Sequence, residues 1–207
     1  DKFRGMQIFR WIHERGAASF EEMTNLSKAF RADISQQFTI GALNLKQTRK
    51  SSDSSTDKFL WETADSQNIE SVIIRDDDRV TACISSQAGC RMRCRFCRTG
   101  QMGFVRDLNP GEILDQLIKM RIKLRDSGED ITNIVFMGMG EPLDNLDSVL
   151  KAASIINMET SLSIGRRKVT ISTCGVAPGI LRLAREYRKA GLALSLNATC
   201  DDLRSKL

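Results

Sequence analysis

The sequence of 207 residues predicts an α/β fold, and two observations support this. From Val80 onward, short apolar runs of the strand type alternate with amphipathic stretches of the helical type. Repeated βα units with nearly continuous apolar strands favour a parallel sheet. Apolar residues make up 41% of the chain, enough for a sizeable core. We expect a helical domain at 1–40, a β connector at 41–79 and an α/β region at 80–207.

The first forty residues are predicted to form two or three short helices. Phe3, Met6 and Phe9 recur at helical spacing. The segment from Ser19 to Glu22 has the form of a capping box, in which the serine accepts from the third amide and the glutamate reaches back. These signals indicate a small helical domain.

The connector is predicted to contain short antiparallel strands. Residues 59–61, 69–74 and 80–84 are β-type runs separated by Asp-rich turns. The polar, Ser-rich stretch 47–57 is typical of a turn or a mobile loop. The connector should therefore lead directly into the first strand of the α/β region.

The α/β region begins with the strand at Val80 and then repeats helix and strand. Asn109 followed by Pro110 predicts a helix start, because Asn caps and Pro needs no N–H there. Four strands are too few to close a barrel, so we expect a partial β/α barrel and a C-terminal truncation, with the chemistry at the carboxyl ends of the strands. The expected elements are a helix from Asn109, a strand at 134–137, a helix from Leu146, a strand at 169–172, a helix at 180–187 ended by Gly191 and a strand at 192–196.

Three cysteines, Cys90, Cys94 and Cys97, follow one another at the spacing C-x3-C-x2-C. Thiolates are the ligands of iron–sulfur clusters, and three of them fill three corners of a four-iron cluster. The remaining iron stays open, as a catalytic metal site requires. Free thiols suited to a metal indicate a reducing compartment, and we expect the cytoplasm.

Polar residues also follow the later strands. The turn from Met137 to Pro142 carries two glycines, and glycines at a strand end allow a ligand to approach the backbone closely. Glu141 in this turn can accept from an ammonium group. The next two strands end in Ser172 and in the run 195–197, which offer hydroxyl and amide groups at the same edge. On their own these groups are equally typical of turns and caps.

Taken together, these motifs resemble one family, the radical S-adenosylmethionine (radical SAM) RNA methyltransferases. Its members methylate carbon 2 of an adenine in 23S rRNA and in tRNA, and a close relative acts on carbon 8. The helical segment also resembles the accessory domain of this family. The motifs that carry the resemblance are Cys83-Ile-Ser-Ser-Gln-Ala-Gly-Cys90, Phe96-Cys97-Arg-Thr-Gly-Gln-Met-Gly-Phe104, Met137-Gly-Met-Gly-Glu-Pro-Leu143, Val169-Thr-Ile-Ser-Thr173 and Ser195-Leu-Asn197.

The resemblance implies a role for each candidate residue. A [4Fe-4S] cluster would be held by the three cysteines, and its open iron would be chelated by SAM. Cys83 would be the resolving cysteine that releases the product by forming a disulfide. Glu70 would be the base that removes the carbon-2 proton. The positions that match SAM contacts are Gly140, Glu141, Ser172, Ser195, Leu196 and Asn197.

The resemblance also implies the partners. They are RNA and an electron donor such as flavodoxin or ferredoxin, and we expect a monomer without a membrane segment. The net charge of +5 suits a polyanionic partner. The methyl-carrying cysteine of the family lies beyond position 207, and neither Cys174 nor Cys200 matches it. We therefore expect this fragment to bind a cluster and SAM without completing methyl transfer.

Two alternatives remain open from the sequence. Within the same superfamily, the reaction could be carbon-8 methylation of adenine or another radical reaction. In a different class, the chain could be a non-catalytic, metal-stabilised RNA-binding module or an inactive fragment. In the module, Cys83, Cys90, Cys94 and Cys97 would surround a zinc ion.

Overall fold

The computed structural model describes residues 1–207. No helix in it is both long and apolar enough to cross a membrane. Its elements are α1 (Lys2–His13), η1 (Phe20–Glu22), α2 (Lys28–Gln37), β1 (Leu43–Lys50), β2 (Thr56–Thr63), β3 (Asn68–Asp76), β4 (Arg79–Cys83), β5 (Gln87–Gly89), α3 (Arg98–Gln101), β6 (Phe104–Asp107), α4 (Pro110–Arg125), β7 (Asn133–Phe136), α5 (Leu146–Ile156), η2 (Arg166–Lys168), β8 (Val169–Thr173), α6 (Ala177–Glu186), β9 (Gly191–Leu194) and α7 (Asp201–Arg204).

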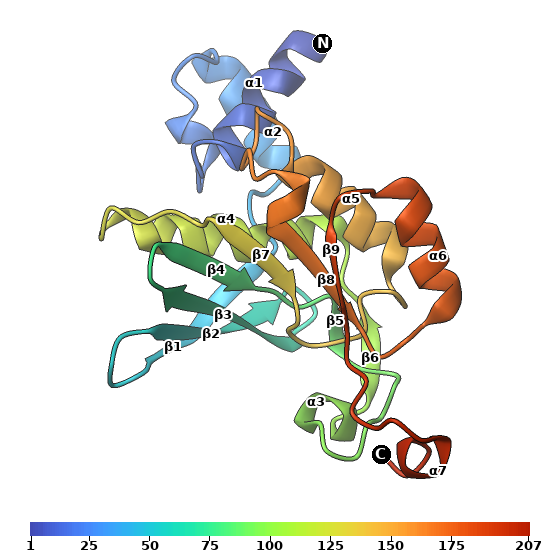
Figure 1. Cartoon of the computed structure of the whole chain (residues 1–207). Helices are drawn as coiled ribbons and strands as arrows, with labels where there is room; N and C mark the ends of the chain where they lie inside the picture. Colours follow the sequence, from blue (N-terminus) through green and yellow to red (C-terminus); the bar gives the residue numbers. More distant parts are fainter.

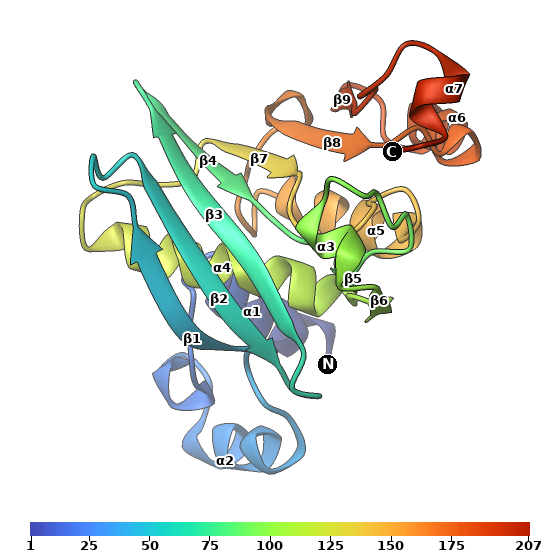
Figure 2. The same cartoon turned by 90° about the horizontal axis from the view of Figure 1, so that it is seen from below.

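One seven-stranded sheet forms the body of the molecule, in the order β1-β2-β3-β4-β7-β8-β9. Strands β1 to β4 are antiparallel, whereas β4, β7, β8 and β9 run parallel. Helix α4 lies along one face of the antiparallel strands, and α5 and α6 lie beside the parallel strands (Figures 1 and 2). The predicted α/β fold with a parallel βα region is confirmed.

The main hydrophobic core is continuous across the antiparallel and parallel parts of the sheet. It includes Trp61 of β2, Ile73 of β3 and Ile134 of β7. The N-terminal helices have a separate small core around Phe20 and Met23, and they lie at one end of the molecule (Figure 1). The predicted boundary between the β connector and the α/β region, at 79/80, stays a prediction. The main hydrophobic core extends across this boundary without interruption.

The local signals of helix starts are confirmed. The backbone N–H of Ser19 donates to Glu22 Oε1 at 3.0 Å, which completes the capping box. Asn109 accepts at 3.0 Å from the backbone N–H of Glu112, with Pro110 as the first residue of α4. These motifs act over three or four residues, so they depend little on the tertiary fold.

Two predictions of element boundaries are wrong. The loop expected at 47–57 is shorter than predicted and occupies 51–55, because β1 continues to Lys50 and β2 begins at Thr56. Strand β1 is an edge strand exposed along nearly its whole length, so it lacks the apolar alternation that marks a strand. Helix α6 ends at Glu186, and Gly191 instead begins β9, where a Cβ would lie 2.6 Å from Thr170 Oγ1.

A buried glutamine holds the strands next to the site in place. Gln116 of α4 accepts from Ser71 Oγ of β3 and from the backbone N–H of Ser85, both at 2.8 Å. Its amide nitrogen donates to the carbonyl oxygen of Ser85 at 3.0 Å. Because these polar groups are buried and satisfied, the carboxyl end of β4 has a fixed position against the helix.

Candidate active site

A cavity of about 280 Å³ lies at the carboxyl ends of the parallel strands. The cysteine-bearing loop after β5 and the ends of β7, β8 and β9 all contribute to its wall. Its lining residues are Cys90, Met92, Cys94, Phe96, Cys97, Phe136, Met137, Gly138, Gly140, Glu141, Pro142, Ser172, Thr173, Cys174, Ser195 and Asn197. Most of the residues predicted from separate motifs therefore lie around one space.

A two-stranded sheet of β5 and β6 anchors the cysteine-bearing loop. The sequence did not predict these strands, which are three and four residues long. Gly89 at the end of β5 has φ +78°, and a Cβ there would lie 1.9 Å from the carbonyl oxygen of Gly103. The N–H of Cys90 donates to that same oxygen at 2.9 Å. Only glycine at position 89 allows the loop to close in this way.

The environment of the Cys90 thiol disfavours its charged form. Burial raises the pKa of Cys90, and the nearby Cys94 and Cys97 thiols also raise it, whereas a backbone hydrogen bond at Met92 opposes the change. All three cysteines are free. A positive metal centre would stabilise the thiolate form of such closely spaced thiols.

The donor set fits an iron–sulfur cluster better than a single metal ion. No group of three or more His, Cys, Asp or Glu side chains is arranged to hold one ion. Thiolates on a cluster do not need to converge on one point, because each binds a different iron. Cys83 does not line the cavity, so the four cysteines of the zinc alternative do not surround a common space.

Glu141 is a buried carboxylate, 4% exposed, whose orientation is set by the backbone. Its Oε1 accepts from the N–H of Leu143 at 3.0 Å, and its Oε2 accepts from the N–H of Cys174 at 2.8 Å. These bonds join the turn after β7 to the end of β8. No cation in the chain pairs with this carboxylate, so its charge is available to a positive group in the cavity.

Hydroxyl and amide groups complete the far wall of the cavity. Ser172 Oγ of β8 lies 3.2 Å from Ser195 Oγ, which follows β9. Asn197 has φ +57° and donates from Nδ2 to the carbonyl oxygen of Ser195 at 3.1 Å. The side chain of Leu196 is exposed and does not line the cavity, unlike the other predicted SAM-contacting positions.

The two predicted catalytic residues lie outside this cavity, on the neighbouring strands. Cys83 is the last residue of β4 and pairs in register with Val72 of β3. Burial raises the pKa of the Cys83 thiol, and a hydrogen bond with the Met137 backbone opposes this shift. Glu70 of β3 forms an ion pair with Lys58, with Nζ and Oε1 2.7 Å apart.

Sequence reasoning missed Gln87 and Cys174. The Oε1 of the fully buried Gln87 accepts from the N–H of Glu141 at 2.9 Å, and its Nε2 donates to Asp107 and Asp144 at 2.8 and 3.0 Å. A run of three polar residues, 85–87, just before Cys90 was the available signal. Cys174 lines the cavity beside Glu141, and burial together with that carboxylate raises its pKa to about 12.

The glycines of the turn after β7 line the cavity, and they also meet a packing constraint that the sequence did not predict. A Cβ on Gly138 would lie 2.7 Å from the backbone of Ile84, and one on Gly140 would lie 2.5 Å from Cβ of Gln87. Gly140 also has φ +98°. These glycines allow the turn to pack against the segment after β4, and that packing is what sets the position of Glu141.

Comparison with known proteins relates this chain to a known family. The model of the radical SAM superfamily matches residues 84–207, and the ribosomal RNA large subunit methyltransferase N-terminal domain matches residues 1–40. The chain is 45% identical over 207 residues to "Dual-specificity RNA methyltransferase RlmN" of Pelobacter propionicus. It is 44% identical to "Probable dual-specificity RNA methyltransferase RlmN" of Thermotoga neapolitana. Both alignments include 100% of this chain, and they include 58% and 60% of the relatives.

A solved structure agrees with these matches. The crystal structure of a radical SAM methyltransferase from Sphaerobacter thermophilus superposes with a TM-score of 0.95 at 40% identity, over 99% of this chain and 60% of that one. The present chain thus spans about 60% of the length of the relatives that it matches. The chain belongs to the radical SAM superfamily and is a homologue of the RlmN-type dual-specificity RNA methyltransferases.

Proposed function

We propose that this chain contributes the cluster-binding and SAM-binding site of an enzyme that methylates carbon 2 of adenine in 23S rRNA and tRNA. One observation carries the proposal. The three thiols and the unpaired carboxylate of Glu141 line the same cavity, at the carboxyl ends of the parallel strands. Ligands of β/α folds bind at this edge of the sheet.

The cysteines and the carboxylate of the cavity have separate binding roles in this proposal. Cys90, Cys94 and Cys97 hold a [4Fe-4S] cluster, which when bound supplies the electron for reductive cleavage of SAM. Glu141 accepts from the SAM ammonium group, and the fixed N–H donors of Leu143 and Cys174 hold its carboxylate in that orientation. The sequence relatives named as RNA methyltransferases support this assignment.

The hydroxyl and backbone groups opposite the cysteines position SAM. Ser172, Ser195 and Asn197 present polar groups to the cavity. The turn at Gly140 allows backbone contacts there, and we propose that Leu196 contributes through its backbone because its side chain points elsewhere. This set could bind the polar ribose and amino-acid parts of SAM.

Glu70 and Cys83 act on the RNA adduct. Glu70 accepts the proton that leaves carbon 2 of the base. Cys83 attacks the sulfur atom of the methyl-carrying cysteine, which is bonded to the new carbon substituent of the base. The S–S bond forms as the carbon–sulfur bond breaks, and the carbon keeps the electron pair and takes up a proton to become the methyl group. The positions of Cys83 and Glu70 on one open sheet face, described below, suit a shared substrate.

The proposal names partners that suit this chemistry. The target base must leave its stack to expose carbon 2, so single-stranded or locally unfolded RNA is the substrate. A flavodoxin or ferredoxin in the cytoplasm supplies the electron.

The test is expression of the full-length gene that includes this chain, together with the methyl-carrying cysteine, in a bacterial strain that lacks adenine-C2 methylation. We expect mass spectrometry of digested 23S rRNA and tRNA to show 2-methyladenosine, and Cys97→Ser to abolish it. If 8-methyladenosine appeared instead, the regiochemistry proposed here would be wrong. If neither nucleoside appeared with the soluble protein present, the function itself would be contradicted.

A further inference from the structure

One face of the strands β1 to β4 is uncovered. Residues alternate along β2 and β3, so that Phe59, Trp61 and Ile73 are buried on the face toward α4. The intervening residues face away from that helix and stay partly or fully exposed. Helix α4 lies behind these strands in Figure 2, and no helix lies on their other side. This second face is open to a partner.

The open face carries the two predicted catalytic residues. Cys83 of β4 is opposite Val72 of β3, and Glu70 lies two residues from Val72 on the same side of the strand. Leu60 of β2 is opposite Glu70 in the register of β2 and β3. A molecule that reaches Cys83 and Glu70 must therefore lie over this face.

Two cations lie directly opposite each other on the same face. Arg49 of β1 pairs in register with Lys58 of β2. Like charges in this arrangement destabilise a sheet, because opposite side chains on neighbouring strands are about 5 Å apart. Lys58 has one carboxylate partner, Glu70, and Arg49 forms no ion pair at all. Glu70 offsets the charge of Lys58, and an added anion would offset the charge of Arg49, which has no partner.

A shallow cavity marks the place for that anion. It has a volume of about 230 Å³ and is lined by Gln47, Arg49, Lys58, Leu60 and Glu70. Two cations and an amide can bind phosphate oxygens, and Leu60 offers an apolar surface to a ribose or a base. Neighbouring strands are about 4.8 Å apart, so β2 and β4 are separated by about 10 Å, within the reach of one nucleotide.

We propose that Arg49 and Lys58 bind a backbone phosphate of single-stranded RNA, next to the nucleotide whose base reaches Glu70 and Cys83. The inference rests on the proposed function, since that function puts an RNA base beside these two residues. The phosphate removes the repulsion between the two cations. Lys58 then contacts both the RNA backbone and Glu70. It therefore positions the RNA relative to the Glu70 carboxylate, which accepts the proton.

The matched control is Lys50, which follows Arg49 in the chain. It lies opposite Asp57, on the face toward α4, and lines a different cavity. Lys50→Gln removes the same charge from the same strand without touching the open face. Any effect of net charge alone should appear equally in both variants.

The experiment measures the anisotropy of a fluorescent single-stranded RNA bound by the chain over a series of salt concentrations. We expect the double variant Arg49→Gln/Lys58→Gln to bind about tenfold more weakly at low salt, and its salt slope to fall by about 0.7 for each phosphate that the variant no longer binds. Lys50→Gln should change affinity by less than about twofold, and Arg49→Lys should retain most of the binding.

Thermal unfolding provides a second readout. Because Arg49 and Lys58 repel each other without RNA, Arg49→Gln should leave the Tm unchanged or raise it by about 1–2 °C. A clear fall in Tm would show that Arg49 has a structural role, and would contradict the assignment.

Three results would overturn the proposal. The first is unchanged affinity and salt slope in the double variant. The second is equal loss in Lys50→Gln. The third is binding of polyglutamate that depends on Arg49 and Lys58 when RNA binding does not, which would make the face a docking site for an acidic protein. If the protein methylated RNA in cells but its RNA binding did not depend on Arg49 and Lys58, only the proposed phosphate site would be overturned. RNA binding that depends on the two cations without methylation would support the site and contradict the proposed function.

Discussion

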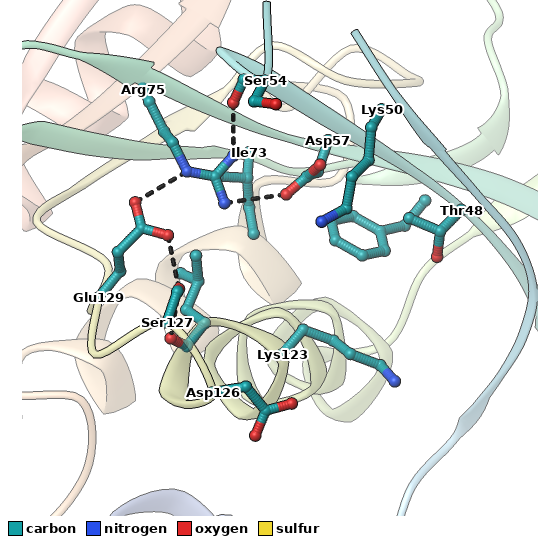
Figure 3. Close-up of a pocket in the computed structure, with 12 residues that line it drawn as sticks. Thr48, Lys50, Ser54, Asp57, Ile73, Arg75, Lys123, Asp126, Ser127 and Glu129 are labelled. Carbon is teal, nitrogen blue, oxygen red and sulfur yellow. Dashed lines mark hydrogen bonds and ion pairs between the residues drawn. The ribbon is translucent and has the colours of Figure 1, made fainter. Parts of the chain in front are cut away.

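Two cavities lie at opposite ends of the same sheet and differ in how their charges are satisfied. The larger one, about 650 Å³, lies between the antiparallel strands β1 to β3 and the carboxyl end of α4. In it Arg75 donates to Asp57 Oδ2 at 2.9 Å and to Glu129 Oε1 at 2.8 Å, and Ser127 donates to Glu129 (Figure 3). At the carboxyl ends, the smaller cavity holds four free thiols, including Cys174, and a carboxylate without a cation.

The comparison shows that the larger cavity of this molecule is not the candidate active site. Charges that pair with one another join the sheet to the end of α4 and stabilise the fold. Polar groups that lack partners within the protein remain available to a ligand. In β/α folds the functional residues gather at the carboxyl ends of the parallel strands, where the smaller cavity lies, whereas the larger cavity lies against the antiparallel strands β1 to β3. The predictions below test it, from the largest expected effect to the smallest.

Removal of a cluster ligand should have the largest effect. We expect Cys94→Ala to lose nearly all of the about four irons per chain after anaerobic reconstitution, because the cluster is held by only three thiolates. Iron analysis and the visible absorption band measure this. Cys200→Ser is the control, since Cys200 is an exposed thiol outside the cavity, and it should keep its iron. Equal iron in both variants would show that Cys94 is not a ligand.

Gly140→Ala should destabilise the fold by about 3 kcal/mol, because it combines a positive φ with a steric clash against Gln87. Gly103→Ala is the matched control. Gly103 has φ +80°, but a methyl group added there would have no heavy atom within 4 Å, so this variant should lose only about 1 kcal/mol. Urea unfolding measures both. If the two variants lost equal stability, the close packing of the Gly140 turn would not matter.

At the opposite end of the sheet, Arg75→Ala should lower the free energy of unfolding by about 2 kcal/mol and leave the iron content unchanged. The variant leaves the carboxylate of Asp57, which is 5% exposed, without its cation. Urea unfolding and iron analysis on the same sample separate the two properties. Loss of iron in a folded Arg75→Ala protein would contradict the separation of stability and function between the two cavities.

The sequence was informative where the signal is local. The cysteine spacing, the turn containing Glu141 and the capping boxes at Ser19 and Asn109 each lie within a few residues, and each is found where it was predicted. Strand β1 was missed because an exposed edge strand needs no apolar residues.

Properties that depend on strand register could not be predicted. Gln87 contacts Glu141 from 54 positions away, and the opposition of Arg49 and Lys58 exists only once β1 and β2 pair. The packing of the glycines near Glu141 against Ile84 and Gln87 could not be predicted either, because it is a tertiary contact.

The smallest effect concerns acid stability. A hydrogen bond from Arg75, followed by one from Ser127, lowers the pKa of Glu129 from its usual 4.5. A lowered carboxylate pKa contributes stability above the unfolded value, and that contribution is lost as the pH falls through the folded value. We expect Glu129→Gln to be less stable than the wild type by under about 1 kcal/mol at pH 7, with the difference disappearing below the folded pKa. Urea unfolding at pH 7 and in acid measures this, and a difference that persisted in acid would contradict it.

Electron paramagnetic resonance of the anaerobically reconstituted and reduced chain, with and without SAM, tests the cysteine-lined cavity most directly. We predict about four irons per chain and a reduced-cluster signal whose shape changes when SAM is added, because one iron has no protein thiolate. Cys97→Ser should remove that signal. A four-iron chain whose signal is the same with and without SAM, or a colourless chain that holds zinc, would contradict the assignment of this cavity.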